Sequence, residues 1–127
     1  MSCLAIAAVA AHLVSAHSSG HYNNINPGLS VRTECGIVAG AYYNSQRRAS
    51  AYVGYSAETR GPVAVFGSLA LATGYRHPRT GKKYIVAPLP MIGVKVSVAG
   101  HWRLVGGYLP SLGPNPHVAH LMLEYRF

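Results

Sequence analysis

The sequence contains no aspartate, and its three carboxylate side chains are Glu34, Glu58 and Glu124. Without aspartate, the chain cannot form a Ser-His-Asp triad or a dense carboxylate site for Mg²⁺ or Ca²⁺. Three scattered glutamates also leave little scope for hydrolysis by a pair of carboxylates. The scarcity of acidic groups therefore excludes several common hydrolytic and metal-dependent chemistries.

Charged residues of both signs make up only 11% of the chain, against about 25% in soluble domains. Eleven Lys and Arg residues give a formal net charge of +8, which suits nucleic acid or an anionic surface such as lipopolysaccharide phosphate. The longest basic runs are the pairs Arg47-Arg48 and Lys82-Lys83, whereas nucleic-acid binders carry denser runs. We therefore expect a membrane surface as the partner and no nucleic acid.

Metal-binding cysteine spacings and long apolar runs are also missing. We expect Cys3 to be removed or unpaired, so that no disulfide forms and Cys35 serves as a small apolar side chain. No stretch reaches the ~18–20 consecutive apolar residues of a membrane-spanning helix. A membrane protein with this sequence therefore has to be a β-barrel.

Residues 1–11 form a short apolar run that ends in small residues, as in a secretory signal, but no basic residues precede it. A signal truncated at its start explains this pattern, and a buried helix or a short membrane anchor are the alternatives. We predict a leader over residues 1–11 and a single β-barrel domain over residues 12–127.

The C-terminal segment alternates strictly between an apolar row and a mostly polar row, which are Ala119, Leu121, Leu123, Tyr125 and Phe127 against His120, Met122, Glu124 and Arg126. A two-residue period places the two rows on opposite faces of a strand. Outer-membrane barrels commonly close their sheet with such a strand, apolar side to lipid. We therefore expect the strand that ends at Phe127 to pair with the first strand and to contact the barrel-assembly machinery.

Turn-forming residues divide the chain into eight alternating segments, at residues 12–19, 27–33, 35–44, 48–58, 62–76, 84–98, 101–109 and 117–127. Spanning strands of the smallest membrane barrels need about 9–11 residues. The pattern predicts an all-β fold, an eight-stranded antiparallel up-and-down membrane β-barrel. A soluble sandwich or lipocalin-like barrel is the alternative, but its outer faces should carry Lys, Glu and Thr.

Aromatic and small residues follow the predicted strands in different ways. Tyrosines near the strand ends are expected to anchor the barrel at the membrane interface, namely Tyr42, Tyr43, Tyr52, Tyr55, Tyr75, Tyr84, Tyr108 and Tyr125. Small residues such as Gly40, Gly54, Ala64, Ser68 and Ala70 fall on the other phase. They either leave room for an acyl chain in the lumen or pack closely against large neighbours.

Five groups of motifs follow one another in order: Tyr22-Asn23 with Pro27-Gly28, Ala39-Gly-Ala-Tyr-Tyr-Asn-Ser45 with Tyr52-Val-Gly-Tyr55, Pro88-Leu-Pro90, Tyr108-Leu-Pro110, and Tyr125-Arg-Phe127. In this order, over about residues 12–127, the chain resembles the lipid A palmitoyltransferase family of eight-stranded outer-membrane barrels. The resemblance implies transfer of a palmitoyl chain from a phospholipid to lipid A. Histidine, aspartate and serine at the extracellular mouth carry that reaction in the family.

The resemblance assigns catalytic positions to His17, Asn44 and Ser45, with Asn44 in place of the family's aspartate. An aspartate holds the histidine tautomer and stabilises the imidazolium, whereas a neutral asparagine only orients it. Two interpretations remain open for Asn44-Ser45, an acyl-transfer site or a polar hairpin tip. Whether the protein is an enzyme is therefore left open.

Basic residues and prolines provide further candidate sites. The predicted substrate-binding residues are Arg47, Arg48, Arg76, Lys82 and Lys83. Together with Arg79, they should lie in connections at one end of the barrel. There they either contact lipid A phosphates or keep the loops soluble. Pro27, Pro88 and Pro90 cannot donate to a sheet ladder. The resembling family uses such interruptions for lateral lipid access. A strand start at Pro27 and a bulge at Pro88 and Pro90 are the alternatives.

The seven histidines show no convincing metal spacing, because His117 and His120 point to opposite faces of one strand. We expect no metal and no cofactor. Three functions are considered: a lipid-binding or divergent acyltransferase barrel, a non-catalytic structural barrel, and a soluble basic barrel that binds nucleic acid or a protein partner. We favour a monomer in a bacterial outer membrane, with lipopolysaccharide and phospholipid as partners.

Overall fold

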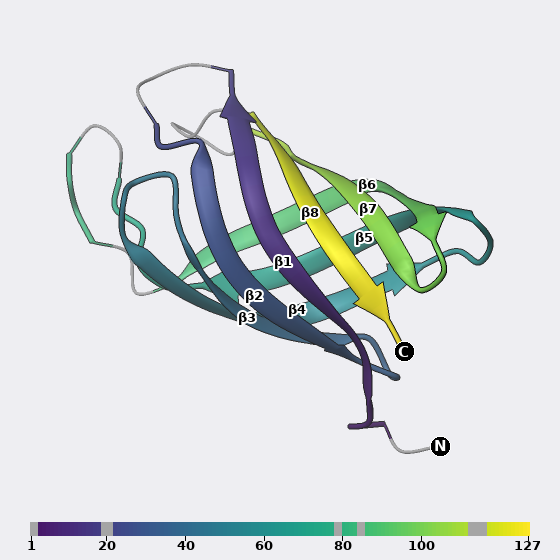
Figure 1. Cartoon of the computed structure of the whole chain (residues 1–127). Helices are drawn as coiled ribbons and strands as arrows, with labels where there is room; N and C mark the ends of the chain where they lie inside the picture. Colours follow the sequence, from purple (N-terminus) through teal and green to yellow (C-terminus); the bar gives the residue numbers. More distant parts are fainter. Residues whose placement is uncertain (1–2, 19–21, 78–79, 84–85, 112–116) are drawn as a thin grey trace.

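The computed structural model describes residues 3–18, 22–77, 80–83, 86–111 and 117–127. Eight antiparallel strands form a closed barrel in sequence order (Figure 1). The strands are β1 (Ile6–His17), β2 (Ile25–Thr33), β3 (Ile37–Tyr43), β4 (Ala49–Glu58), β5 (Val63–Ala72), β6 (Ala87–Ala99), β7 (Trp102–Leu109) and β8 (Val118–Arg126). The predicted fold class is confirmed.

The last strand closes the barrel on the first, as the C-terminal alternation predicted. Val9 lies opposite Tyr125 and Ala11 opposite Leu123 in the β1–β8 register. The first strand begins at Ile6 rather than at residue 12, so residues 6–11 form half of the strand that closes the barrel. The predicted leader over residues 1–11 stays a prediction about processing, and its removal would take that half of β1 away.

The connections define two different ends of the barrel. Residues 18–24, 44–48, 73–86 and 110–117 connect strands at one end, here called the long-loop end. Residues 34–36, 59–62 and 100–101 make the turns at the other, the short-turn end, where both chain termini also lie (Figure 1). Membrane barrels of this class show the same asymmetry between short turns and longer loops.

The outer surface of the barrel is apolar. All six charged residues of the strands lie on the lumen-facing phase: Arg32, Glu58, Lys95, Arg103, Glu124 and Arg126. Outward side chains such as Val65, Leu69 and Ile92 are 58–62% exposed. Monomeric soluble proteins rarely expose apolar surface of this extent. No helix among the described residues is long and apolar enough to cross a membrane.

The tyrosines divide between the two faces, so only part of them lie on the outer surface, where the predicted interface role would place them. Tyr43, Tyr55 and Tyr108 are exposed on the outer surface, where Tyr125 also packs against Trp102 and Phe127. The other described strand-end tyrosines, Tyr42, Tyr52 and Tyr75, line the lumen cavity instead. Tyr84 lies outside the described residues. The prediction failed for the lumen tyrosines because position near a strand end does not fix the face.

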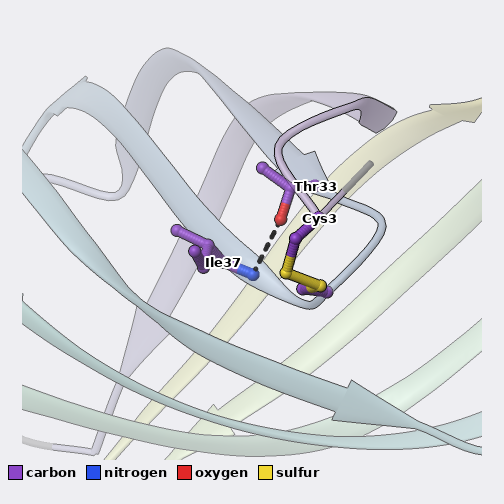
Figure 2. Close-up of a disulfide and its surroundings, with 4 residues drawn as sticks. Cys3, Thr33 and Ile37 are labelled. Atoms are coloured by element: carbon purple, nitrogen blue, oxygen red, sulfur yellow. Dashed lines mark hydrogen bonds between the residues drawn. A yellow bond between two sulfur atoms is a disulfide. The ribbon is translucent and has the colours of Figure 1, made fainter. Parts of the chain in front are cut away.

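A disulfide joins Cys3 to Cys35, with the two Cα atoms 4.9 Å apart (Figure 2). The expectation of unpaired cysteines is therefore wrong. The early start of β1 explains the error, because Ile6 pairs with Thr33 and carries Cys3 to the β2–β3 turn. The Ala5 carbonyl accepts the Glu34 N–H at 2.9 Å, and Thr33 Oγ1 accepts the Ile37 N–H at 3.2 Å. The bridge thus attaches the chain start to an ordered turn.

Candidate functional site

A cavity of about 430 Å³ occupies the lumen, a volume in the range of small-molecule sites. It extends from Tyr22 and Ser45 at the long-loop end to Lys95 and Glu124 near the short-turn end. Ser68 and Ala70 line this open space, whereas Gly40 packs closely against Tyr52 and Gly54 against Ala70. Of the two alternatives for the small lumen residues, open space therefore holds for Ser68 and Ala70 and close packing holds for Gly40 and Gly54.

The cavity has two chemically different walls. Strands β1–β4 contribute mainly polar side chains, among them His12, Ser15, Asn26, Ser30 and Tyr52. Strands β5–β8 contribute mainly apolar ones, among them Phe66, Leu89, Met91, Val105 and Met122. A ligand that fills this space would contact hydrogen-bonding groups along one side and hydrocarbon along the other.

A hydrogen-bonded group from three strands, β1, β4 and β8, lines the cavity. His12 Nδ1 lies 2.9 Å from His120 Nε2, and His12 Nε2 lies 2.7 Å from the Tyr52 hydroxyl. The Tyr42 ring packs on His12, and its hydroxyl bonds to that of Tyr75. Burial raises the pKa of the Tyr75 phenol above its ordinary value. This group was not predicted, although the lumen phase of His120 and the predicted β1–β8 pairing could have indicated it.

The floor of the cavity is an ionic cluster from five strands. Lys95 Nζ bridges Glu58 Oε1 at 2.9 Å and Glu124 Oε2 at 3.0 Å. Arg103, which is 1% exposed, bonds to both glutamates, at 2.6 Å from NH1 to Glu58 Oε2. Arg32 completes the cluster, with NH2 3.3 Å from Glu58 Oε1. Two of the three glutamates of the chain are thus used inside the barrel.

The three predicted catalytic residues lie at the long-loop end but do not form one hydrogen-bonded unit. His17 bonds through Nδ1 to Asn24 Oδ1 at 2.9 Å and stacks on Tyr22. Asn44 is fully buried and makes no hydrogen bond to His17 or to the Ser45 side chain. Ser45 and His17 both line the cavity. The catalytic role of these residues stays a prediction.

Asn44 organises the β3–β4 hairpin. Its Oδ1 accepts the backbone N–H groups of Gln46 at 2.8 Å and of Arg48 at 3.1 Å. Its Nδ2 donates to Ser50 Oγ at 2.8 Å and to the Gly74 carbonyl at 2.9 Å. Both ends of the amide are therefore engaged in structural bonds, as expected for an asparagine that shapes a turn.

The two connections that carry the basic residues, 44–48 and 73–86, are hydrogen-bonded to each other at the long-loop end, where the sequence predicted them to lie together. Gln46 Oε1 accepts the Arg76 N–H and Gln46 Nε2 donates to the Arg76 carbonyl, both at 2.7 Å. Arg76 pairs with Lys83 in an isolated antiparallel bridge. Arg47, Arg48, Lys82 and Lys83 are exposed, and Arg79 lies outside the described residues. Binding of phosphate by these side chains stays a prediction.

Pro27 interrupts the β2–β3 ladder, but a neighbouring side chain repairs the gap. Pairing of β2 with β3 begins only at Gly28 opposite Tyr42, which places Pro27 opposite Tyr43. The buried Asn26 donates from Nδ2 to the Tyr43 carbonyl at 3.1 Å. Pro27 follows Ile25 and Asn26 within β2, so it does not start the strand.

Pro88 and Pro90 lie where β6 separates from β7. Ser97 donates to the Pro62 carbonyl on the β5 side, and donors alternate between neighbours along an antiparallel strand. The even-numbered positions of β6, including both prolines, therefore face β7 with their backbone nitrogens. Pairing of β6 with β7 stops at Ile92 opposite Tyr108, although pairing with β5 continues to Ala87.

A second proline faces this gap. Continuing the β6–β7 register places Pro110 opposite Pro90, so neither position has an N–H to donate. Pro88, Pro90 and Pro110 all line the lumen cavity. The cavity thus reaches the seam between β6 and β7 at the long-loop end.

Metal ligands do not converge in the part of the chain that the structure describes. No group of three or more His, Cys, Asp or Glu side chains there could hold a metal ion. His12 and His120 contact each other, but their hydrogen bonds link them to Tyr52 rather than to a third ligand.

Comparison with known proteins agrees with the fold. No protein-family profile and no curated protein sequence matches the chain. The solution NMR structure of the de novo designed transmembrane barrel TMB2.3 is similar, with a TM-score of 0.59 and 16% sequence identity. The match covers 97% of this chain and 96% of the designed one. The chain is thus an eight-stranded β-barrel whose fold is compatible with a membrane location.

Proposed function

We propose that this protein is a bacterial outer-membrane barrel that admits the apolar chain of a membrane lipid into its lumen. It would be a divergent relative of the lipid A acyltransferases. The observation that carries the proposal is the continuity of the lumen cavity with the proline seam between β6 and β7. Backbone donors are missing on both sides of that seam, so an acyl chain can enter there without breaking ladder hydrogen bonds.

The charge distribution supports the membrane setting and an orientation. The lipid-facing side chains of all eight strands are uncharged, which a hydrocarbon environment requires. The sequence of the four long-loop connections holds six basic residues and no acidic one. This end would face lipopolysaccharide phosphates outside the cell, since arginine binds such oxygens in pairs.

Acyl transfer from a phospholipid to lipid A is the second candidate function. It is favoured by the position of His17 and Ser45 on the same cavity mouth. Against it, the Asn44 amide is engaged in hairpin bonds rather than orienting His17. Lipid entry without a complete catalytic site therefore agrees better with the observed geometry.

Photolabelling tests lipid entry directly. The protein would be reconstituted with a phospholipid carrying a diazirine at the end of one acyl chain, irradiated and mapped by mass spectrometry. We expect labels on the lumen residues Met91 and Met122 as well as on the outer residues Leu69 and Val94. Labels confined to the outer residues would contradict entry into the lumen.

Two further measurements separate the candidate functions. Detergent-dependent extraction and heat-modifiable gel mobility test the membrane barrel, and a soluble detergent-free monomer would overturn it. Mass spectrometry of lipid A from cells expressing the protein, its Ser45→Ala variant or its His17→Ala variant tests catalysis. An added acyl chain that disappears in both variants would establish acyl transfer, whereas unchanged lipid A would favour the non-catalytic barrel.

A further inference from the structure

The ionic cluster at the cavity floor is not balanced in charge. Among the described residues it contains three cations, Arg32, Lys95 and Arg103, and two carboxylates, Glu58 and Glu124. The remaining glutamate, Glu34, is exposed in the β2–β3 turn. The floor therefore carries one positive charge more than its carboxylates neutralise.

Arg32 is the surplus cation of the cluster. Lys95 and Arg103 each bond to both glutamates, so together they already satisfy the two carboxylates. Arg32 NH2 approaches Glu58 Oε1 at 3.3 Å and Glu124 Oε1 at 3.6 Å, but neither contact has hydrogen-bond geometry. Its Nε and NH2 atoms are buried and have no hydrogen-bond partner among the described residues.

Buried polar groups are nearly always hydrogen-bonded, and an unpaired buried charge is especially costly. Arg32 lines the cavity, so an anion that reaches the floor would supply both the missing charge and the missing acceptors. A carboxylate matches a guanidinium in shape and carries the single negative charge that the cluster lacks.

The walls above the floor determine what else the anion can carry. Phe66, Val105 and Met122 line the cavity together with Arg32, and the space continues to the long-loop end. An ion without an apolar chain would leave this space unfilled.

We infer that the lumen binds a long-chain carboxylate head first, with its carboxylate on Arg32 at the floor and its hydrocarbon chain toward the long-loop end. This assignment rests on the cavity and its charged floor, and it does not depend on lateral entry or on acyl transfer. It gives the lumen a ligand class of its own, free fatty acids, in addition to the chains of membrane lipids.

Binding of cis-parinarate and its methyl ester to the reconstituted protein tests the charge requirement. We expect the acid to bind about tenfold or more tightly than the ester, because only the acid offers a charged acceptor to Arg32. Arg32→Met should remove this preference and leave ester binding unchanged. Arg126→Met is the matched control, since Arg126 is exposed outside the cavity, and it should bind both probes as the native protein does.

Orientation gives a readout that needs no variant. Stearate with a nitroxide near its methyl end and stearate with a nitroxide near its carboxyl would be compared by electron paramagnetic resonance. A water-soluble nickel chelate should broaden the signal of the first probe and spare that of the second. Equal binding of acid and ester, or the reverse pattern of broadening, would overturn the inference, whatever the outcome of the photolabelling and lipid A measurements.

Discussion

At the residue scale, Asn44 shows how a resemblance and a structure can assign different roles to one side chain. By resemblance it stands where the family carries a catalytic aspartate, but its amide accepts two backbone N–H groups and donates to Ser50 and Gly74. An aspartate could keep the two accepted bonds and would lose both donated ones. The residue is thus suited to its own hairpin in a way that the acidic residue is not.

We predict that Asn44→Asp destabilises the barrel by about 2–4 kcal/mol, since a buried carboxylate would face the Gly74 carbonyl without a donor. Urea unfolding in lipid vesicles, followed by gel mobility, would measure the change. Asn24→Asp serves as the control, because Asn24 is exposed and its side-chain Oδ1, which an aspartate keeps, accepts from His17. A stable Asn44→Asp variant that acylates lipid A would instead show that this position kept its catalytic role.

The face of most residues could be predicted from sequence alternation, but their partners could not. Alternation places His120 and Glu124 on one face of the last strand because a two-residue period fixes the phase of a strand. The contact of His12 with His120 and Tyr52 depends on how three strands are staggered around the barrel, which no local pattern encodes. The roles of Asn26, near the start of β2, and of Gln46, in the β3–β4 hairpin, were missed because polar residues near turns look alike until their neighbours are known.

At the scale of the strands, the seam between β6 and β7 should respond to restored donors. In Pro90→Val a backbone N–H would face the Pro110 carbonyl, and the ladder could extend beyond Ile92. We expect a gain of about 0.5–1.5 kcal/mol in unfolding free energy, the contribution of one net hydrogen bond. Lumen photolabelling should fall at the same time, because a longer ladder narrows the seam.

The control for the seam is Pro62→Val, which changes a proline in the β4–β5 turn at the other end of the barrel. It should leave lumen photolabelling unchanged. If Pro90→Val extends the ladder, as seen by slowed amide exchange near Tyr108, and lumen labelling persists, the lipid enters elsewhere.

The link between β1 and the β2–β3 turn gives a second prediction at this scale. The double variant Cys3→Ser/Cys35→Ser should lose about 2–4 kcal/mol of stability, because the bridge closes a large loop of the unfolded chain. Urea unfolding of oxidised and reduced native protein should show the same difference, and reductant should not affect the double variant. Equal stability of all these forms would mean that strand pairing alone holds the start of β1.

Strand number and order followed from the sequence, whereas strand ends did not. Turn residues and alternation located eight segments in the correct order. The start of β1 was missed because an apolar run of small residues suits a leader as well as a strand whose inner face packs small side chains. The disulfide was missed for the same reason.

At the scale of the whole molecule, the floor cluster holds five strands together at one level of the barrel. Arg103→Met should cost about 3–5 kcal/mol, since it removes the guanidinium that bonds to both Glu58 and Glu124 and leaves Lys95 as their remaining shared hydrogen-bond partner. Arg32→Met should cost far less, because the native carboxylates are already satisfied without Arg32. The two variants compared by urea unfolding provide each other's control, and equal losses would contradict the assignment of Arg32 as surplus.

The barrel architecture was predictable because strand length, strand count and the apolar outward phase all indicate it. The ionic cluster at the cavity floor could not be predicted. Its members come from five strands whose relative heights depend on the stagger of the sheet, and they are Arg32, Glu58, Lys95, Arg103 and Glu124. The small number of charged residues in the sequence favoured a membrane protein. It gave no indication that two of the three glutamates, Glu58 and Glu124, form ion pairs inside the barrel.

The covalent link between Cys3 and Cys35 has a consequence for the order of assembly. It encloses the first hairpin, β1 with β2, in a ring of the chain. In an oxidised but still unfolded chain, β1 therefore stays near β2 while β8, the last strand in the sequence, has to find it from the far end of the chain. Strand β1 would then stay in place beside β2 while the rest of the sheet forms. Closure of the barrel would be one late step, in which β8 pairs with β1.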